Sequence, residues 1–252
     1  MKKIILGFIL CIIFVIPNWQ STYCDDYHQD KENIIEKSLK FTGFDKLKNY
    51  SKSTIAVSLI EINDEQTNKL DTSNNKKEAW LIKFKDISFK DSSKYVHPKE
   101  SNTKSFDVLI ENKTNKLISI ISITDSTYFT FKDTLFEKRE NIIRDSKMSF
   151  HDFVSDSFNI VNFTDALYAC THNPFLAKAI EARCMFFTFD SGIPQLSYKT
   201  PHPFWKIKLY GVKVYSKLVH KRDSEGKQEI NVTHLIDAIT GELIIRYTIP
   251  EN

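Results

Sequence analysis

The chain has 252 residues, of which 41% are hydrophobic and 27% are charged, and its formal net charge at pH 7 is +3. This composition is typical of a globular protein. The small net charge and the absence of a basic block argue against nucleic-acid binding. The six glycines lack the spacing of a phosphate-binding loop, which argues against a nucleotide-binding fold.

Residues 1–23 are predicted to be an export signal. Two lysines precede an apolar run over residues 4–16. At about 13 residues this run is shorter than the roughly 20 that a membrane span needs, although a retained anchor is the alternative. Cys24 is a candidate for lipidation, but Tyr23 stands where bacterial lipoprotein signals carry a small residue. We therefore expect a periplasmic, cell-surface or secreted protein that contacts the membrane only through this signal or a lipid on Cys24.

A helix and two strands are predicted to follow the signal. Apolar residues over 29–47 recur at the spacing of an amphipathic helix, which is expected to end near Gly43. Residues 54–62 and 79–89 alternate apolar and polar side chains, as half-buried strands do. The first half therefore begins with a helix that can cover one face of a sheet.

Two hairpins are predicted, one in each half of the chain. Residues 105–110 and 117–123 flank one polar turn, and residues 230–236 and 243–249 flank another. Asparagine and glycine occupy matching positions in these turns, and both tolerate left-handed backbone angles, so one geometry is expected for both. The turn residues are Glu111, Thr114 and Asn115 in the first, and Asp237, Thr240, Gly241 and Glu242 in the second.

The second half is predicted to start with its own helix. Residues 124–159 are expected to be a connector that contains a short helix over 133–144. The elements after the connector are, in order, a helical segment over 163–183 broken at Pro174, a strand over 184–189 and a loop with three prolines over 191–203.

A recurring pattern about 125 positions apart relates the two halves. In each half the apolar alternation shifts by one position, between Phe84 and Ile87 and again between Leu209 and Val212. Such a shift predicts a β-bulge. The recurring residues are Trp80, Ile82, Phe84, Ile87 and Phe89, then Trp205, Ile207, Leu209, Val212 and Val214. The pattern predicts two tandem units, over residues 29–123 and 160–252.

The cysteines and histidines offer three candidate pairs. Cys170 and Cys184 can form a disulfide only if the chain turns back between them, and two buried thiols are the alternative. Cys170 and His172 are a candidate thiol–imidazole pair, although residues two apart on a helix do not face each other. His220 and His234 can meet across adjacent strands, but no third metal ligand is evident. We therefore predict no catalytic residue, metal or cofactor.

The second half resembles the PepSY domain. The resemblance lies in the strand that begins Trp205-Lys206-Ile207 and in the stretch from His234 to Glu242, which ends Ala-Ile-Thr-Gly-Glu. The first half departs from it, because Asn115 replaces the glycine and Lys116 replaces the final acid. The resemblance implies an α+β fold of two tandem units, each a helix packed on an antiparallel four-stranded sheet of the cystatin/PepSY type. It also implies a role in restraining proteases or at the cell surface, and it carries no catalytic residues.

These observations favour an exported, non-enzymatic binding or regulatory module of the bacterial cell envelope with a protein or peptide partner. One alternative is an envelope hydrolase or metal-dependent enzyme that uses Cys170 with His172 or His220 with His234. The other is a small-ligand-binding protein that uses a cleft between the two units.

Overall fold

A computed structural model describes residues 30–47, 50, 55–62, 77–89, 103–124, 148–150, 159–190, 192, 197–215 and 227–249. The chain divides into two compact units, residues 1–38 and 39–252. In the first unit, residues 30–38 are helical. In the second, residues 39–42 are helical, and Gly43 follows with a left-handed φ of 71°. The predicted helix end near Gly43 is therefore confirmed. The strands and the other helical elements all belong to residues 39–252.

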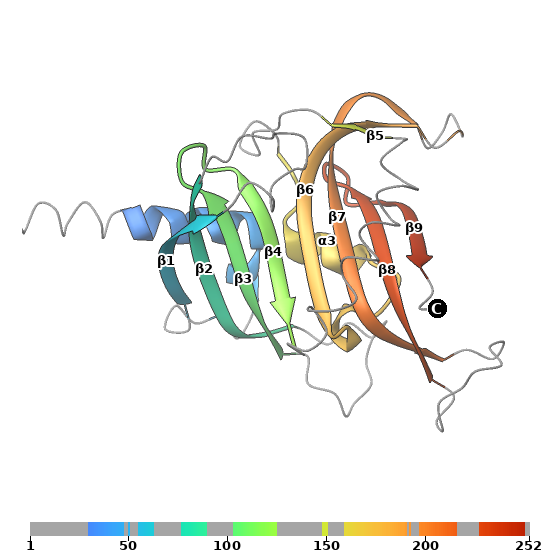
Figure 1. Ribbon diagram of the computed structural model, residues 1–252, viewed down its shortest axis with the longest axis horizontal. Helices are drawn as coiled ribbons and strands as arrows, with labels where there is room; N and C mark the ends of the chain where they lie inside the picture. Colours follow the sequence, from blue (N-terminus) through green and yellow to red (C-terminus); the bar gives the residue numbers. More distant parts are fainter. Residues whose placement is uncertain are drawn as a thin grey trace, which may run out of the picture. The chain divides into compact units, whose positions relative to one another are not determined.

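One antiparallel sheet dominates this unit, in the order β1-β2-β3-β4-β6-β7-β8-β9, with β5 attached to β6 (Figure 1). The strands are β1 Ile55–Ile62, β2 Lys77–Ser88, β3 Thr103–Glu111, β4 Leu117–Ile123, β5 Met148–Phe150, β6 Ala179–Phe189, β7 Tyr198–Tyr215, β8 Lys227–Asp237 and β9 Leu243–Ile249. The short helical elements are η1 Phe44–Lys46, α3 Phe163–Ala169 and η6 Pro174–Leu176.

The prediction of two tandem helix-plus-four-strand units is wrong. Residues 120–123 of β4 pair with residues 179–182 of β6, so the strands of both halves form one continuous sheet. Within the described part of residues 39–252, the helical elements are also few and short. The physical reason is the edge of β4, whose backbone N–H and C=O groups would lack partners if each half closed separately. The small-ligand alternative therefore loses the two separate units between which its cleft was predicted.

The helix predicted over 163–183 is much shorter than expected. α3 ends at Ala169, because Cys170 takes extended angles with φ −60° and ψ 139°. Asn173 then caps η6, with its side chain accepting a 2.9 Å hydrogen bond from the backbone N–H of Phe175. Residues 179–183 belong to β6, where residues 179–182 pair with both β4 and β7. Pairing on both sides outweighs the local helical pattern.

The loop predicted over 191–203 is replaced from Tyr198 onward by β7. Pro201 and Pro203 lie inside this strand, although proline cannot donate to a ladder. The register explains why they are tolerated: β7 pairs with β6 from Tyr198, but with β8 only from Phe204. Both prolines therefore precede the residues that must bond on two sides.

Both predicted β-bulges are confirmed. The register of β2 on β3 shifts between Phe84 and Ile87, and that of β7 on β8 shifts between Leu209 and Val212. A residue with left-handed angles lies inside each bulge, Asp86 with φ 55° and Gly211 with φ 60°. The same backbone irregularity therefore occurs at matching places in the two halves of the sheet.

The shared geometry of the two hairpin turns is also confirmed. Asn115 has φ 56° and Gly241 has φ 76°. In both turns the left-handed residue donates a 2.9 Å backbone hydrogen bond to the carbonyl at the start of the turn, from Asn115 to Glu111 and from Gly241 to Asp237. The register also shifts beside each turn.

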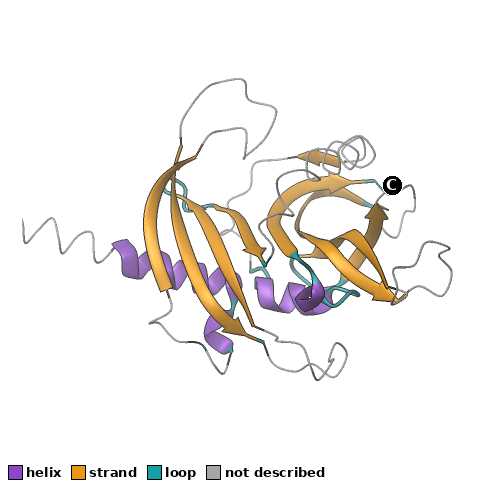
Figure 2. Cartoon of the chain, turned by 60° about the horizontal axis from the view of Figure 1, so that its bottom comes forward, coloured by secondary structure: helices purple, strands orange, loops and turns teal. Residues whose placement is uncertain are grey.

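The short helical elements lie along one face of the sheet (Figure 2). Aromatic side chains pack them against it. The Phe44 ring lies 5.2 Å from the rings of Phe84 and Phe106, centroid to centroid. Phe163 of α3 lies 5.6 Å from Phe106 and 6.1 Å from Trp205. This core therefore spans both halves of the sheet. Within the described residues, none of the helices has the length and apolarity to cross a membrane.

Candidate functional site

A row of directly opposed residues crosses the whole sheet. In strand order these residues are Val57, Ile82, Val108, Ile120, Ala182, Ile207, His234 and Arg246. The row is apolar on six strands and polar on β8 and β9. Because alternate residues of a strand share a face, the row lies on the face that carries the aromatic core. His234 and Arg246 are therefore the polar end of an otherwise hydrophobic row.

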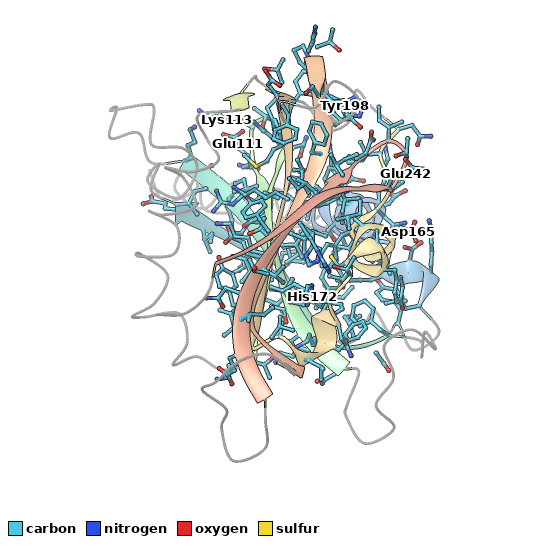
Figure 3. The ribbon with its side chains drawn as sticks, turned by 90° about the vertical axis from the view of Figure 1, so that its right-hand side faces the viewer. Glu111, Lys113, Asp165, His172, Tyr198 and Glu242 are labelled. Carbon is cyan, nitrogen blue, oxygen red and sulfur yellow. The ribbon has the colours of Figure 1, made fainter. Side chains whose placement is uncertain are left out.

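Four side chains meet at this end and form what we call the Thr171 cluster: Thr171, His172, His234 and Arg246. The Thr171 hydroxyl oxygen lies 3.3 Å from His172 Nδ1, 3.3 Å from His234 Nε2 and 3.1 Å from Arg246 Nη1, which donates to it. The two imidazole rings lie 5.6 Å apart, centroid to centroid. His172 comes from the segment that follows α3 (Figure 3). Three separate elements thus supply one site.

Capping interactions hold the segment that carries Thr171 and His172. At the start of α3, the Asn162 side chain accepts a 3.0 Å hydrogen bond from the backbone N–H of Asp165. The extended angles of Cys170 end α3, and Asn173 begins η6 immediately after the cluster residues. The segment is therefore constrained at both ends, which limits the conformational freedom of Thr171 and His172.

The cluster carries positive charge and neutral imidazoles. His234 is fully buried, and burial lowers its pKa to about 3, with His172 and Arg246 adding to the effect. Burial and Arg246 also lower the pKa of half-buried His172. Within the described residues, no carboxylate lies at ion-pair distance from exposed Arg246. His234 Nδ1 is buried and lacks a hydrogen-bond partner.

The structure does not assemble the candidate cysteine pairs. Cys170 and Cys184 are both free and buried, so the possible disulfide is absent and the expectation of two buried thiols holds. The Cys170 sulfur donates to the carbonyl oxygen of Ala166 at 3.8 Å, while His172 Nδ1 lies against Thr171. Burial raises the pKa of the Cys184 thiol. Neither thiol is exposed as a nucleophile.

The histidines meet in a combination that the sequence did not suggest. His234 lies beside His172, whereas His220, its predicted partner, lies outside the described residues. The described part of the chain contains no group of three His, Cys, Asp or Glu residues that is able to hold a metal. Two imidazoles next to an arginine are also a poor cation site, because the guanidinium repels a metal.

The predicted turn and repeat residues have structural roles. Trp80 Nε1 donates to Asn112 Oδ1 at 2.8 Å, and Trp205 Nε1 donates to the carbonyl oxygen of Val161 at 2.9 Å. The Thr114 hydroxyl donates to the Glu111 carboxylate, and the backbone N–H of Glu242 donates to Thr240 Oγ1 at 3.2 Å. The contacts of Trp80, Thr114 and Glu242 hold the two hairpin turns in place, and that of Trp205 ties the segment before α3 to β7.

Asp237 links its turn to the start of β7. One carboxylate oxygen accepts hydrogen bonds from the backbone N–H groups of Ile239 and Thr240, at 2.8 and 3.1 Å. The other lies 2.9 Å from His202 Nε2 and 3.2 Å from the Tyr198 hydroxyl. Burial raises the pKa of Asp237, but His202 and the backbone donors outweigh burial, so the net shift is downward. Burial and Asp237 raise the pKa of Tyr198 to about 12.

A second polar cluster lies on the opposite face of β6 and β7. Arg183 Nη2 lies 2.8 Å from Glu181 Oε1, and the Tyr210 hydroxyl donates to Glu181 Oε2 at 3.0 Å. Burial raises the pKa of Glu181, whereas Arg183 and Lys208 lower it, and the net shift is downward. Both carboxylate oxygens are used within the sheet, so this cluster is a structural network.

Sequence reasoning missed Thr171 and Arg246. Arg246 carried a usable signal, because it is a charged residue inside the apolar strand Leu243–Ile249, where the first half has Ile120 at the matching place. Thr171 carried none. Comparisons with known protein families, curated proteins and solved structures find no match for this chain.

Proposed function

We propose that the chain is an exported, non-enzymatic binding module of the bacterial cell envelope that recognises an acidic group of a protein or peptide partner at the Thr171 cluster. The observation that carries this proposal is the guanidinium of Arg246, which is exposed and, within the described residues, has no carboxylate partner. Export rests on the N-terminal sequence, and restraint of a protease is one form that such binding can take.

The donors of the cluster suit a carboxylate. An arginine side chain presents several N–H groups in a planar fork, which matches the two oxygens of a carboxylate. The Thr171 hydroxyl lies 3.1 Å from one guanidinium nitrogen and adds a further donor beside it. Burial is the main cause of the lowered pKa values of both imidazoles, and the positive charge of Arg246 adds to both. An anion that binds here partly neutralises that charge, and the attraction between the two charges favours its binding.

A direct binding measurement tests the proposal. N-acetylglutamate methylamide presents one carboxylate and no other charge, and we expect it to bind the full chain. Arg246→Gln is expected to weaken binding at least about tenfold, as a lost charge-assisted hydrogen bond does. Lys83→Gln is the matched control, because Lys83 is also an exposed cation on a strand of this sheet. Equal affinity of both variants and the parent chain, measured by titration calorimetry, contradicts the proposal.

A hydrolase is the alternative that one observation favours. The exposed Thr171 hydroxyl lies 3.3 Å from two neutral imidazoles, an arrangement in which a base faces a nucleophile. The arrangement lacks an orienting group, because the Nδ1 atom of His234 has no hydrogen-bond partner. Ester hydrolysis above background that Thr171→Val abolishes would establish this alternative in place of the binding function.

A further inference from the structure

We propose, building on the anion-binding function above, that the acidic partner is an extended polypeptide segment that pairs with the outer edge of β9 and places an Asp or Glu side chain opposite Arg246. Strand addition of this kind uses backbone hydrogen bonds for affinity and side-chain contacts for selectivity.

The first argument is a comparison of β9 with β4. Each strand follows a hairpin turn with a left-handed residue, at Asn115 before β4 and at Gly241 before β9. Each has its register shifted beside that turn. β4 is paired on its far side by β6, whereas β9 pairs only with β8 among the strands of the described residues. The strand in the first half thus already has the neighbour that we propose for β9.

The second argument is the row that ends at Arg246. In the first half the row runs from Ile120 on β4 to Ala182 on β6, so an apolar residue faces an apolar residue. Arg246 occupies the matching place in the second half. Within the described chain, no strand beyond β9 supplies a residue opposite it. Directly opposed residues on antiparallel strands have Cβ atoms about 5 Å apart, and pairs of opposite charge stabilise the pairing. An acidic residue is therefore the complement of Arg246.

The third argument is the strand itself. β9 is Leu-Ile-Ile-Arg-Tyr-Thr-Ile, with no proline and with Arg246 as its only charged residue. Edge strands that avoid pairing usually carry prolines, bulges or several charges. β9 therefore lacks two of the features that prevent pairing, proline and several charges, and it carries one arginine that selects what pairs beside it.

The same charge argument disfavours a second copy of this chain as the occupant. β1 is the strand at the other end of the sheet. The residue of β1 that occupies the place of Ala182 in the pattern is Val57, about 125 positions earlier in the chain. If β1 of a second copy paired with β9 in the way that β6 pairs with β4, Val57 of that copy would lie opposite the guanidinium of Arg246.

Four peptide probes test this inference on the full chain. The first is acetyl-Thr-Val-Glu-Val-Thr-amide, the second carries Gln in place of Glu, the third is N-methylated at both valines, and the fourth is N-acetylglutamate methylamide. We expect the first to bind at least about tenfold tighter than each of the others. We also expect Arg246→Ile, which installs the residue found at position 120, to remove the preference for Glu over Gln. Hydrogen exchange is expected to slow in β9 and to stay unchanged in β1.

The outcomes separate the two proposals. If the single-residue acid binds and the pentapeptide binds no tighter, strand addition is wrong while the anion site stands. If neither binds, both proposals fail. If the chain self-associates in sedimentation experiments and the pentapeptide does not compete, a second copy occupies the edge and strand addition by an acidic peptide is overturned. Circular dichroism of Arg246→Ile shows whether the sheet is retained. If it is not, Arg246→Lys is the second variant on which the peptides are measured.

Discussion

The first four strands of the sheet and the last four place different side chains at matching positions. Val108 and Ile120 in the first half correspond to His234 and Arg246 in the second, and all four lie in one row. In the first half another strand continues the sheet, and the residues are apolar. In the second half the described sheet ends, and the residues are polar. The difference teaches that the same strand arrangement is part of the sheet interior at β3 and β4 and a candidate binding edge at β8 and β9.

The faces opposite the helices differ in the same way. Lys83 and Asp107 in the first half are 3.8 Å apart and nearly half exposed, with side-chain exposures of 48% and 45%. Glu181 and Lys208 in the second half are 7% exposed. An exposed pair contributes little to stability, whereas breaking a buried charge network is costly. The polar groups of the second half are therefore more tightly tied to the fold.

The segment just before β6, which contains Ala177 and Lys178, contacts both halves of the sheet. Lys104 Nζ of β3 donates to the carbonyl oxygen of Ala177 and to Thr124 Oγ1, both at 2.9 Å. Lys178 Nζ pairs with Glu229 of β8 at 2.8 Å. The two halves are thus fastened to one stretch of chain, which accounts for their behaviour as one sheet.

The largest effect is expected at Phe44, whose ring contacts Phe84 and Phe106 of the first half and Phe163 of α3. Phe44→Ala is expected to lower the free energy of unfolding by about 3–5 kcal/mol, since the ring is fully buried. Urea denaturation is expected to show one transition. Two separate transitions would mean that the halves are independent. Leu59→Ala, at a side chain that is 40% exposed, is the control and is expected to cost about 1 kcal/mol or less.

Acid stability tests the difference between His234 and Val108. The folded chain keeps His234 neutral down to about pH 3, while an unfolded histidine gains its proton near 6.5. The unfolded state therefore binds more protons between these values, and stability falls as the pH drops through this window. His234→Val is expected to remove roughly 2–4 kcal/mol of this loss. Urea midpoints from pH 7 to 3 measure it, and parallel curves for the two proteins contradict the prediction.

Lys104 predicts an effect of opposite direction at high pH. Burial lowers its pKa from 10.5 to about 8. Between these values the unfolded chain holds a proton that the folded chain has released, so stability rises with pH through this window. Lys104→Met is expected to lack this rise, which amounts to roughly 2–3 kcal/mol. Denaturation at pH 7.5 and 10.5 measures it. Lys83→Met is the control, and an equal rise in both variants counts against the prediction.

The smallest effect concerns the two bulges. Gly211 and Asp86 both have left-handed angles, and a Cβ on Gly211 would lie 2.8 Å from Lys178 Cδ. Gly211→Asp is expected to cost about 1–2 kcal/mol, whereas Asp86→Gly is expected to be neutral or slightly stabilising. Thermal melts of both variants check this. If Gly211→Asp and Asp86→Gly lose equal stability, each bulge requires the residue that it has, and the prediction that glycine suits both is wrong.

Local spacing predicted much of the fold. The helix end at Gly43, the strands of both hairpins, the two bulges and the left-handed turn residues follow from alternation and from which residues tolerate positive φ. Within residues 163–203, the predicted strand 184–189 lies inside β6, and α3 forms at the start of the predicted helix. The rest of that helix and the loop from Tyr198 were wrong, because pairing on both sides of β6 and the one-sided pairing at the start of β7 overrode local propensity. Of the candidate site, the sequence indicated His172 and His234 separately but neither their contact nor the roles of Thr171 and Arg246.

By itself, the sequence determined the periodic features of this protein, because alternation, bulges and turns depend on neighbours a few positions apart. Only the tertiary structure decided that β4 pairs with β6 and that His172, His234 and Arg246 meet at Thr171. These contacts join residues far apart in the chain, and their free energy comes from satisfying backbone edges and burying side chains that no local window contains.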